Sequence, residues 1–144
     1  MAGSRKVGAE STVYVLDSFA FLAYLNGEVG TAQVQAVLRE AQKGECRVCL
    51  SLVNLGEIAC IVERRRGLPA AHRVLGLIDS LPVDILPVTR EVVLQAAHIK
   101  AHHPLAYADA FAVACALQEG ATLLTGDPEY RAVESLVPVA WLPR

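Results

Sequence analysis

Short apolar runs alternate along the chain with longer segments in which apolar residues recur every three or four positions. The first run, residues 12–16, is rich in residues that favour strands and ends at Asp17-Ser18, a typical helix start. The same criteria predict further strands over 47–50, 83–86, 122–125 and 139–141. They predict helices over 19–25, 31–43, 52–66, 70–81, 90–102 and 107–118.

Strands that alternate with helices in this way are typical of an α/β fold with a mostly parallel sheet. The length of 144 residues fits one compact domain. No internal repeat, low-complexity tract or linker interrupts the sequence. We therefore predict a single domain over 1–144, in which residues 1–11 form a flexible N-terminal segment.

Composition and charge exclude several classes of protein. Apolar residues make up 53% and charged residues 19%, which gives a substantial core and excludes a disordered chain. The formal net charge of −2 excludes a protein that is basic over its whole surface. Asp17, Glu57 and Asp109 interrupt the apolar stretches, so none reaches the roughly 20 residues of a membrane span. Without a signal-peptide pattern at the N-terminus, a cytoplasmic location with no membrane association is expected.

The four cysteines are predicted to be small core residues that form no disulfides. Cys46 and Cys49 form a C-x-x-C, but within a strand this spacing directs the two side chains to opposite faces. Cys60 and Cys115 each lie in an apolar helical pattern. The alternative, a zinc or redox site, lacks a second cysteine pair.

Four carboxylates stand alone in segments that otherwise have the composition of a protein interior. Asp17 is the only charged residue from 11 to 27, Glu57 from 48 to 62, and Asp109 from 104 to 118. Asp127 follows the uncharged run 120–126. A buried carboxylate costs several kcal/mol unless it is paired, hydrogen-bonded or bound to metal, so these four positions need an explanation.

Three of them have a simple structural alternative. Asp17 suits a helix N-cap, Asp109 suits the first turn of a helix, and Asp127 suits an Asp-Pro turn. Glu57 has none, because it lies in mid-helix with Val53, among other apolar residues, on its face. One shared site explains all four more simply than separate accidents do.

The predicted topology favours such sharing. Asp17 and Asp127 follow the carboxyl ends of strands, where open α/β sheets bind their ligands. Several hard oxygen ligands without matching cations suit Mg²⁺, for which Mn²⁺ can substitute, and do not suit zinc. Thr125 and Ser18 add hydroxyls that can orient a carboxylate or a water molecule. Phosphodiester hydrolysis is one of the main uses of such a metal site.

The residues around the four acids resemble the motifs of the PIN-domain ribonucleases, and above all the VapC-type toxins of prokaryotic toxin–antitoxin pairs. The resemblance extends from Val13 to Trp141, with the motifs in the right order and at fitting distances. The segments that carry it are Val15-Leu-Asp17-Ser-Phe-Ala-Phe-Leu-Ala-Tyr-Leu25, Asn54-Leu-Gly-Glu57-Ile, Leu105-Ala-Tyr-Ala-Asp109-Ala-Phe-Ala and Leu124-Thr-Gly-Asp127-Pro-Glu.

This resemblance implies a Mg²⁺-dependent endoribonuclease and a PIN-like three-layer fold, with a five-stranded sheet in the order 3-2-1-4-5. It also implies a homodimer that a small VapB-type antitoxin, encoded next to it, inhibits. Carried over by position, Asp17, Glu57, Asp109 and Asp127 are the acidic quartet of the site, and Thr125 supports them. Ala106 departs from the pattern, because relatives often have a capping Ser or Thr there. The net acidic charge is a second departure.

The mechanism that we predict has Asp17 and Asp109 as direct metal ligands, with Glu57 and Asp127 binding directly or through water. Two alternatives are an inactive PIN domain that only binds partners and an aspartyl-phosphate protein, either a receiver or a phosphatase, with Asp17 as its nucleophile. For a haloacid-type phosphatase, a second Asp is expected at position 19, which is Phe.

Two basic clusters and one apolar surplus complete the prediction. Arg64-Arg65-Arg66 ends a helix, and Lys100, His102 and His103 form a second group; both suit either solvent exposure or RNA phosphate contact. A surplus of apolar side chains in the early helices predicts a twofold-symmetric homodimer. These side chains are Phe19, Phe21, Leu22, Tyr24 and Leu25.

Overall fold

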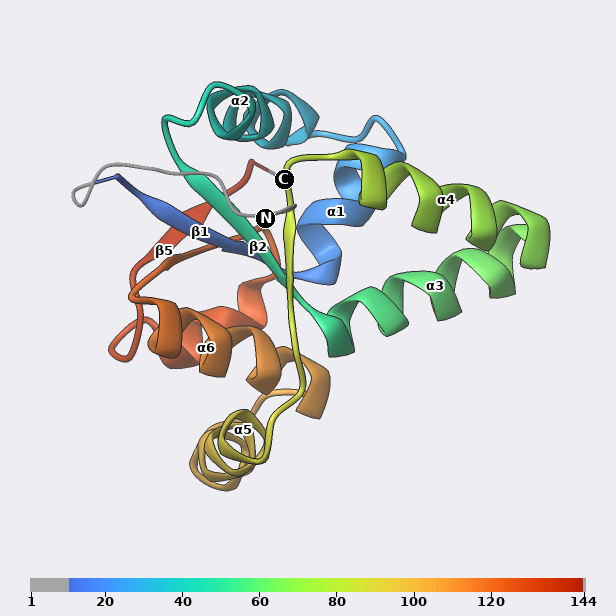
Figure 1. Cartoon of the computed structure of the whole chain (residues 1–144). Coiled ribbons are helices and arrows are strands. Elements are labelled where there is room, and N and C mark those ends of the chain that lie inside the picture. Colours follow the sequence, from blue (N-terminus) through green and yellow to red (C-terminus); the bar gives the residue numbers. More distant parts are fainter. Residues whose placement is uncertain (1–10, 144) are drawn as a thin grey trace.

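The computed structural model describes residues 11–143 (Figure 1). The flexible N-terminal segment predicted for residues 1–11 therefore lies almost wholly outside the described residues. A parallel sheet of five strands runs through the middle of the molecule in the order β3-β2-β1-β4-β5, which confirms the predicted fold class and strand order. The strands are β1 (Val13–Leu16), β2 (Arg47–Ser51), β3 (Asp84–Leu86), β4 (Thr122–Thr125) and β5 (Val139–Trp141).

Helices cover both faces of this sheet and make a three-layer structure (Figure 1). One hydrophobic cluster lies between the sheet and the fifth and sixth helices, and the other between the sheet and the first four. The helices are α1 (Ser18–Leu25), α2 (Thr31–Gln42), α3 (Leu52–Arg66), α4 (Leu68–Ser80), α5 (Arg90–His102) and α6 (Tyr107–Glu119). None of these helices, within residues 11–143, has both the length and the apolar composition needed to cross a bilayer.

Two local features differ from the prediction. Helix α4 begins at Leu68, two residues earlier than expected, because Pro69 occupies the first turn of the helix, where its missing N–H has no intrahelical partner to lose. The turn after β4 continues into a 3₁₀-helix, η1 (Pro128–Val133), for which Asp127 is the N-cap. This short helix matters for the site because it fixes the position of Glu129.

The cysteine prediction holds at three positions and fails at the fourth. Cys46 and Cys49 are buried on opposite faces of the sheet, one in each hydrophobic cluster, and Cys115 is buried in α6. Cys60 is exposed, because it lies on the outer side of α3, where Arg64 donates to its Sγ. All four thiols are free.

Most of the apolar side chains of α1 that predicted a dimer pack in the core of the protein. Phe21 is fully buried, and Leu22, Tyr24 and Leu25 pack against the same cluster. Only Phe19 remains more than one third exposed among these five side chains. The surplus therefore no longer argues for a dimer.

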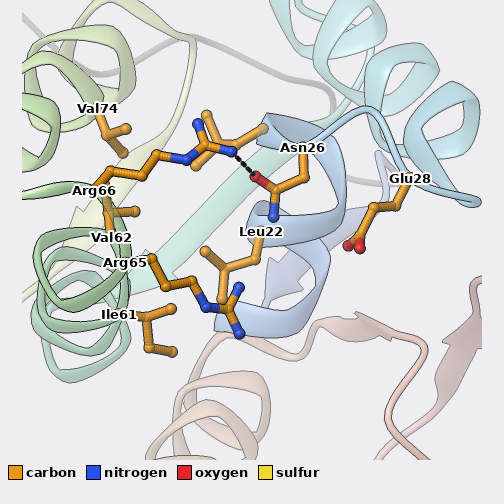
Figure 2. A pocket seen from close by; sticks show the side chains of 9 residues that line it. Leu22, Asn26, Glu28, Ile61, Val62, Arg65, Arg66 and Val74 are labelled. Atoms are coloured by element: carbon orange, nitrogen blue, oxygen red, sulfur yellow. Dashed lines mark hydrogen bonds between the residues drawn. The ribbon is translucent and has the colours of Figure 1, made fainter.

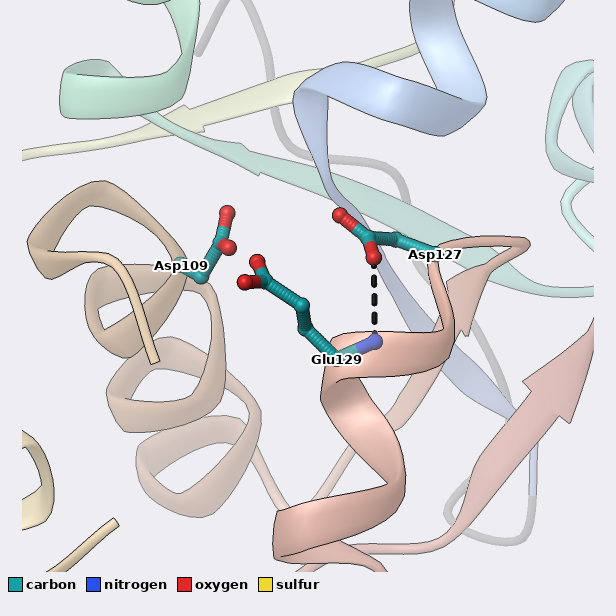
Figure 3. A group of neighbouring side chains, drawn as sticks. All are labelled: Asp109, Asp127 and Glu129. Atoms are coloured by element: carbon teal, nitrogen blue, oxygen red, sulfur yellow. Dashed lines mark hydrogen bonds between the residues drawn. The ribbon is translucent and has the colours of Figure 1, made fainter. Parts of the chain in front are cut away.

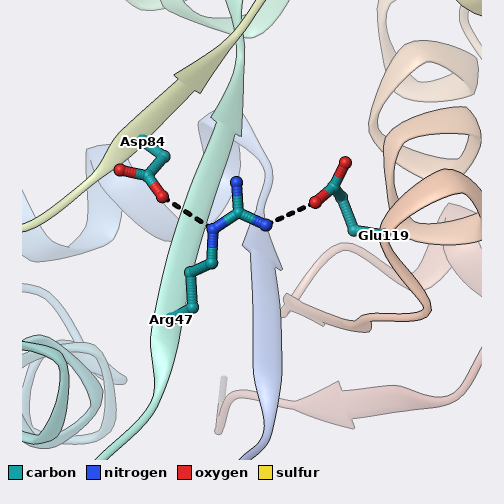
Figure 4. Close-up of polar contacts among 3 residues, drawn as sticks. All are labelled: Arg47, Asp84 and Glu119. Atoms are coloured by element: carbon teal, nitrogen blue, oxygen red, sulfur yellow. Dashed lines mark hydrogen bonds and ion pairs between the residues drawn. The ribbon is translucent and has the colours of Figure 1, made fainter. Parts of the chain in front are cut away.

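An ion-pair cluster fastens the end of the sheet opposite to the carboxyl ends of its strands (Figure 4). Arg47, at the start of β2, donates through Nε to Asp84 Oδ2 at 2.7 Å and through Nη1 to Glu119 Oε1. The three residues belong to β2, β3 and the last turn of α6, and each side chain is about one third exposed or less. The cluster thus joins three segments that are distant in sequence.

We expect Arg47→Met to lower the melting temperature, because the substitution leaves two half-buried carboxylates without their cation. Breaking such a partly buried pair costs on the order of 1–2 kcal/mol, which is about 3–6 °C for a chain of this size. Arg39→Met, in an exposed position of α2, is the matched control and should be neutral. Equal melting temperatures for the two variants, measured by circular dichroism, would show that the cluster contributes nothing.

Candidate metal site and acidic cleft

Asp17 lies where β1 ends and α1 begins, and it has two structural roles at once. Its Oδ1 accepts a hydrogen bond from the backbone N–H of Ala20 at 2.8 Å, which makes it the N-cap of α1. Its Oδ2 accepts a hydrogen bond from Thr125 Oγ1 at 2.7 Å. The side chain is 1% exposed. The N-cap interpretation is therefore correct, but it does not explain the whole environment of this carboxylate.

Thr125 connects the first strand to the loop that carries Asp127. It ends β4, the neighbour of β1 in the sheet, and is fully buried. Its Oγ1 donates to Asp17 and accepts from the backbone N–H of Asp127 at 3.0 Å. One hydroxyl thus fixes two of the predicted site residues relative to each other.

Glu57 reaches the same region from α3. Ser18 Oγ donates to its Oε1, so the residue after Asp17 holds the carboxylate of another helix. Asn54 Nδ2 lies 3.5 Å from the same oxygen and donates to the backbone carbonyl of Ala108 at 3.2 Å. Asn54 is fully buried and joins α3 to the start of α6, where Asp109 lies.

The third and fourth acids face each other across the cleft (Figure 3). Asp109 lies in the first turn of α6 and is 8% exposed. Asp127 Oδ1 accepts the backbone N–H of Glu129 at 3.0 Å, which caps η1. Ala106, the N-cap of α6, makes no side-chain capping bond, as the sequence led us to expect.

Glu129 is the acidic residue that the prediction missed. One carboxylate oxygen each from Asp109, Asp127 and Glu129 lie within 4.8 Å of one another, close enough to share a metal ion (Figure 3). A signal is present in the sequence, because Glu129 ends the Leu124–Glu129 segment that carries part of the resemblance. The pattern alone suggests that the turn ends at Pro128, whereas the 3₁₀-helix directs the next side chain back to the site.

All these acids line one open cleft of about 300 Å³. Within residues 11–143, no Lys or Arg lines it. The structure therefore brings the four predicted acids together at the carboxyl ends of β1 and β4. The lining residues are Asp17, Ser18, Phe19, Leu22, Glu57, Ile61, Ala106, Asp109, Asp127 and Glu129.

The family assignment follows from a match to a family model. The model of the PIN domain matches residues 14–136, which is most of the chain and includes every acid of the cleft. The chain belongs to the PIN domain family. No curated protein shows significant similarity to it.

Solved structures with the same fold agree with this assignment. This PIN domain superposes on VapBC2 from Rickettsia felis, crystallised with a promoter DNA fragment, with a TM-score of 0.72 at 13% identity over 92% of this chain and 100% of the other. VapC20 from Mycobacterium tuberculosis, a toxin that cleaves the sarcin–ricin loop, superposes with a TM-score of 0.66 at 22% identity. The match covers 85% of this chain and 95% of VapC20. A DNA-bound VapBC from Salmonella typhimurium superposes with a TM-score of 0.70 at 15% identity, over 90% of this chain and 97% of the other. At these identities the likeness shows the fold.

Burial and mutual repulsion act on the two central carboxylates of this PIN domain. Burial raises the pKa of Asp17 from 3.8 to about 7, although hydrogen bonds from Thr125 and Ala20 lower it, and the charges of Asp109 and Asp127 raise it further. Burial is also the main cause that raises the pKa of Asp109 to about 7. The negative charge of the cleft is therefore costly unless a cation neutralises it.

The donor set of the PIN domain fits a hard divalent cation. Every candidate ligand is a carboxylate oxygen, which suits Mg²⁺ or Mn²⁺. Two buried polar atoms near the acids, Tyr130 Oη and Asn54 Oδ1, find no hydrogen-bond partner among residues 11–143. The Tyr130 hydroxyl is close enough to Asp109 to lower the pKa of that carboxyl, without reaching standard hydrogen-bond geometry. Buried polar groups normally find partners, so a hydrated ion suits this environment.

The two basic clusters lie outside the cleft of the PIN domain. Arg64, Arg65 and Arg66 are exposed at the end of α3, and Arg66 Nη2 donates to Asn26 Oδ1 at 3.2 Å. On α5, Lys100 and His102 are exposed, while His103 Nδ1 lies 3.0 Å from the carbonyl of Ile99.

An apolar groove adjoins the cleft between α1, α3 and α4 (Figure 2). Leu22 and Ile61 line both the groove and the cleft, so the two are continuous. Arg65 and Arg66 stand over the apolar surface of the groove (Figure 2). Its lining residues are Leu22, Leu25, Asn26, Glu28, Ile61, Val62, Arg65, Arg66 and Val74.

Proposed function

We propose that this PIN domain is a Mg²⁺-dependent endoribonuclease and acts as the toxin of a cytoplasmic toxin–antitoxin pair. One observation carries the proposal. Acids from the junction of β1 and α1, from α3 and α6, and from the start of η1 line one cleft that, within residues 11–143, contains no lysine or arginine. A purely structural role does not require such an accumulation of unpaired charge, because buried carboxylates destabilise a fold that leaves them unpaired.

In this mechanism Asp17 and Asp109 would hold the ion directly, while Glu57, Asp127 and Glu129 would bind it directly or through water. Bound Mg²⁺ supplies charge neutralisation at the phosphate and acidifies a water molecule. Thr125 fixes the rotamer of Asp17, and Ser18 does the same for Glu57. One carboxylate of the cleft accepts a proton from the attacking water.

The structure disfavours the aspartyl-phosphate alternative. A receiver needs a lysine after a late strand, and within residues 11–143 no lysine lines the cleft. The strand order also differs from that of flavodoxin-like receivers, in which the second strand lies at the edge of the sheet.

The ends of the RNA products test the proposed reaction. Purified protein and Mg²⁺ are incubated with total cellular RNA, and the fragments are mapped. Water attack in which the 3′-oxygen leaves gives a 5′-phosphate and a 3′-hydroxyl, whereas attack by the 2′-hydroxyl of the RNA expels the 5′-oxygen and leaves a cyclic phosphate. Cyclic phosphate ends would reject the mechanism, and intact RNA would favour the alternative of a PIN domain that only binds partners.

The partner that we propose is a small VapB-type antitoxin encoded next to this chain. Its apolar helix would fill the groove beside the cleft, since the two are continuous through Leu22 and Ile61. A basic side chain at the end of that helix would then reach Asp17 and Asp109, because a guanidinium can fork onto a carboxylate. The homodimer is part of the same proposal and rests on the family resemblance.

We expect Val74→Glu to weaken antitoxin binding by about 30-fold or more, because the apolar helix of the antitoxin would have to pack on the new carboxylate or on the ion pair that it forms with Arg66 of the same groove. RNA cleavage should not change, since Val74 does not line the cleft. Leu94→Glu, at a position 55% exposed on α5, is the matched control. Calorimetry with the purified antitoxin gives both affinities, and equal affinities for the two variants would exclude the groove as its binding site.

A further inference from the structure

Phe19 is the one aromatic side chain that lines the acidic cleft within residues 11–143. It is the second residue of α1 and follows Ser18, whose hydroxyl holds Glu57. Phe21, two positions later, is fully buried, whereas Phe19 keeps 38% of its surface exposed. The fold thus leaves a large apolar ring open to solvent at the edge of a group of carboxylates.

The ring of Phe19 is held against the loop that carries the site. A Cβ on Gly126 would lie 2.6 Å from Phe19 Cε1 and 3.3 Å from Cζ, so any larger residue at position 126 would displace the ring. Gly126 is not among the glycines with positive φ, so its small size, and not its backbone freedom, is what this position requires. Since Gly126 lies between Thr125 and Asp127, the ring has a fixed position relative to two site residues.

A cleft lined by carboxylates cannot hold RNA through ion pairs with its own side chains. Within residues 11–143 it contains no Lys or Arg, and the whole chain has a net charge of −2. Beyond the ion itself, affinity within the cleft must therefore come from uncharged contacts. Stacking of an unpaired base on an aromatic ring is such a contact, and proteins that bind single-stranded RNA use it widely.

We propose that Phe19 is a stacking platform for one unpaired base of the RNA, next to the phosphate that is cut. This inference rests on the proposed function and adds a binding residue and a substrate preference to it. A base stacked there must be out of a duplex, so the cleft selects single-stranded segments or loops. Because the ring of Phe19 packs against Gly126, its position is fixed before RNA binds. The side chain therefore loses less conformational entropy on binding.

The test compares wild type with Phe19→Leu on a short single-stranded RNA that the wild type cuts. Loss of one stacking contact should raise KM by about 5- to 100-fold. The Mg²⁺-dependent rise in melting temperature should stay as in wild type, which shows that the fold and the ion site are intact. Tyr107→Leu, which removes an exposed aromatic ring outside the cleft, is the matched control and should leave KM unchanged.

Abasic RNA makes the test specific to stacking. Removing the base that stacks on Phe19 should raise KM of the wild type by a similar factor and add nothing to the defect of Phe19→Leu. An unchanged KM for Phe19→Leu beside an active wild type would overturn this inference alone, as would a defect that is equal for intact and abasic RNA. A variant that binds antitoxin less tightly but cuts RNA normally would assign the ring to the partner surface and also overturn it. A wild type that cuts no RNA would overturn the proposed function and this inference together.

Discussion

Asp17→Asn is expected to lower the rate of Mg²⁺-dependent RNA cleavage by more than about 100-fold, as loss of one major electrostatic contact in an active site does. The amide keeps an oxygen for the N–H of Ala20, so α1 retains its N-cap. It removes a negative charge from the centre of the cleft, and with it a ligand that Mg²⁺ prefers. The initial rate of cleavage of a labelled RNA measures the effect.

Two controls separate this effect from unfolding. Asp79→Asn changes an exposed acid on α4 and should cleave RNA at the wild-type rate. At about pH 8 the melting temperature of Asp17→Asn in chelator should be equal to that of wild type or higher, because there the wild type buries a charge that the variant lacks. Normal cleavage by Asp17→Asn would remove Asp17 from the mechanism.

The metal-free protein is expected to lose stability as the pH rises from about 5 to about 8. The ordinary pKa of an aspartate side chain is 3.8, and the fold raises the pKa of both Asp17 and Asp109 to about 7. Between these values the folded state binds more protons than the unfolded state, so the free energy of unfolding falls with rising pH. The stabilising contribution is complete below pH 3.8 and is lost as the pH passes about 7. For Asp17 alone the difference corresponds to about 4 kcal/mol.

Mg²⁺ should reverse this loss, because it binds the ionised carboxylates of the folded state and not the unfolded chain. Melting curves in chelator and in Mg²⁺, recorded at about pH 5 and about pH 8, should therefore differ most at the higher pH. Asp17→Asn should reduce the pH dependence in chelator and leave the part that comes from Asp109. Stability in chelator that rises towards pH 8 would contradict the proposed burial of these charges.

Much of the fold could be predicted from local pattern. The bounds of α3 and β4 agree with the sequence analysis at both ends, since Ser51 is a clear N-cap and Gly67 ends α3. The start of α4 could not be placed as well, because Pro69 serves equally as a helix breaker and as a first-turn residue. The periodicity of apolar residues does not determine the order of the strands in the sheet, so the order could be predicted only from the family resemblance.

The candidate site was predictable where a charge stood out against an apolar segment. Asp17 and Asp109 are buried, and each is the only charged residue of a long uncharged run. Glu129 gave no such contrast, because Arg131 and Glu134 follow closely and its role depends on the path of η1. The sequence analysis gave Tyr130 no role, and its buried hydroxyl near Asp109, which has no hydrogen-bond partner in the part of the chain that the structure describes, became visible only in three dimensions.

We propose that a divalent ion held by the acidic cleft makes this PIN domain a nuclease. RNA cleavage by purified wild type that has been stripped with chelator, followed as Mg²⁺ is added back, tests this dependence. We predict no cleavage in chelator, and a rate that increases with Mg²⁺ until it saturates. Mn²⁺ should substitute, because it favours the same oxygen ligands. Full cleavage in excess chelator would contradict the claim.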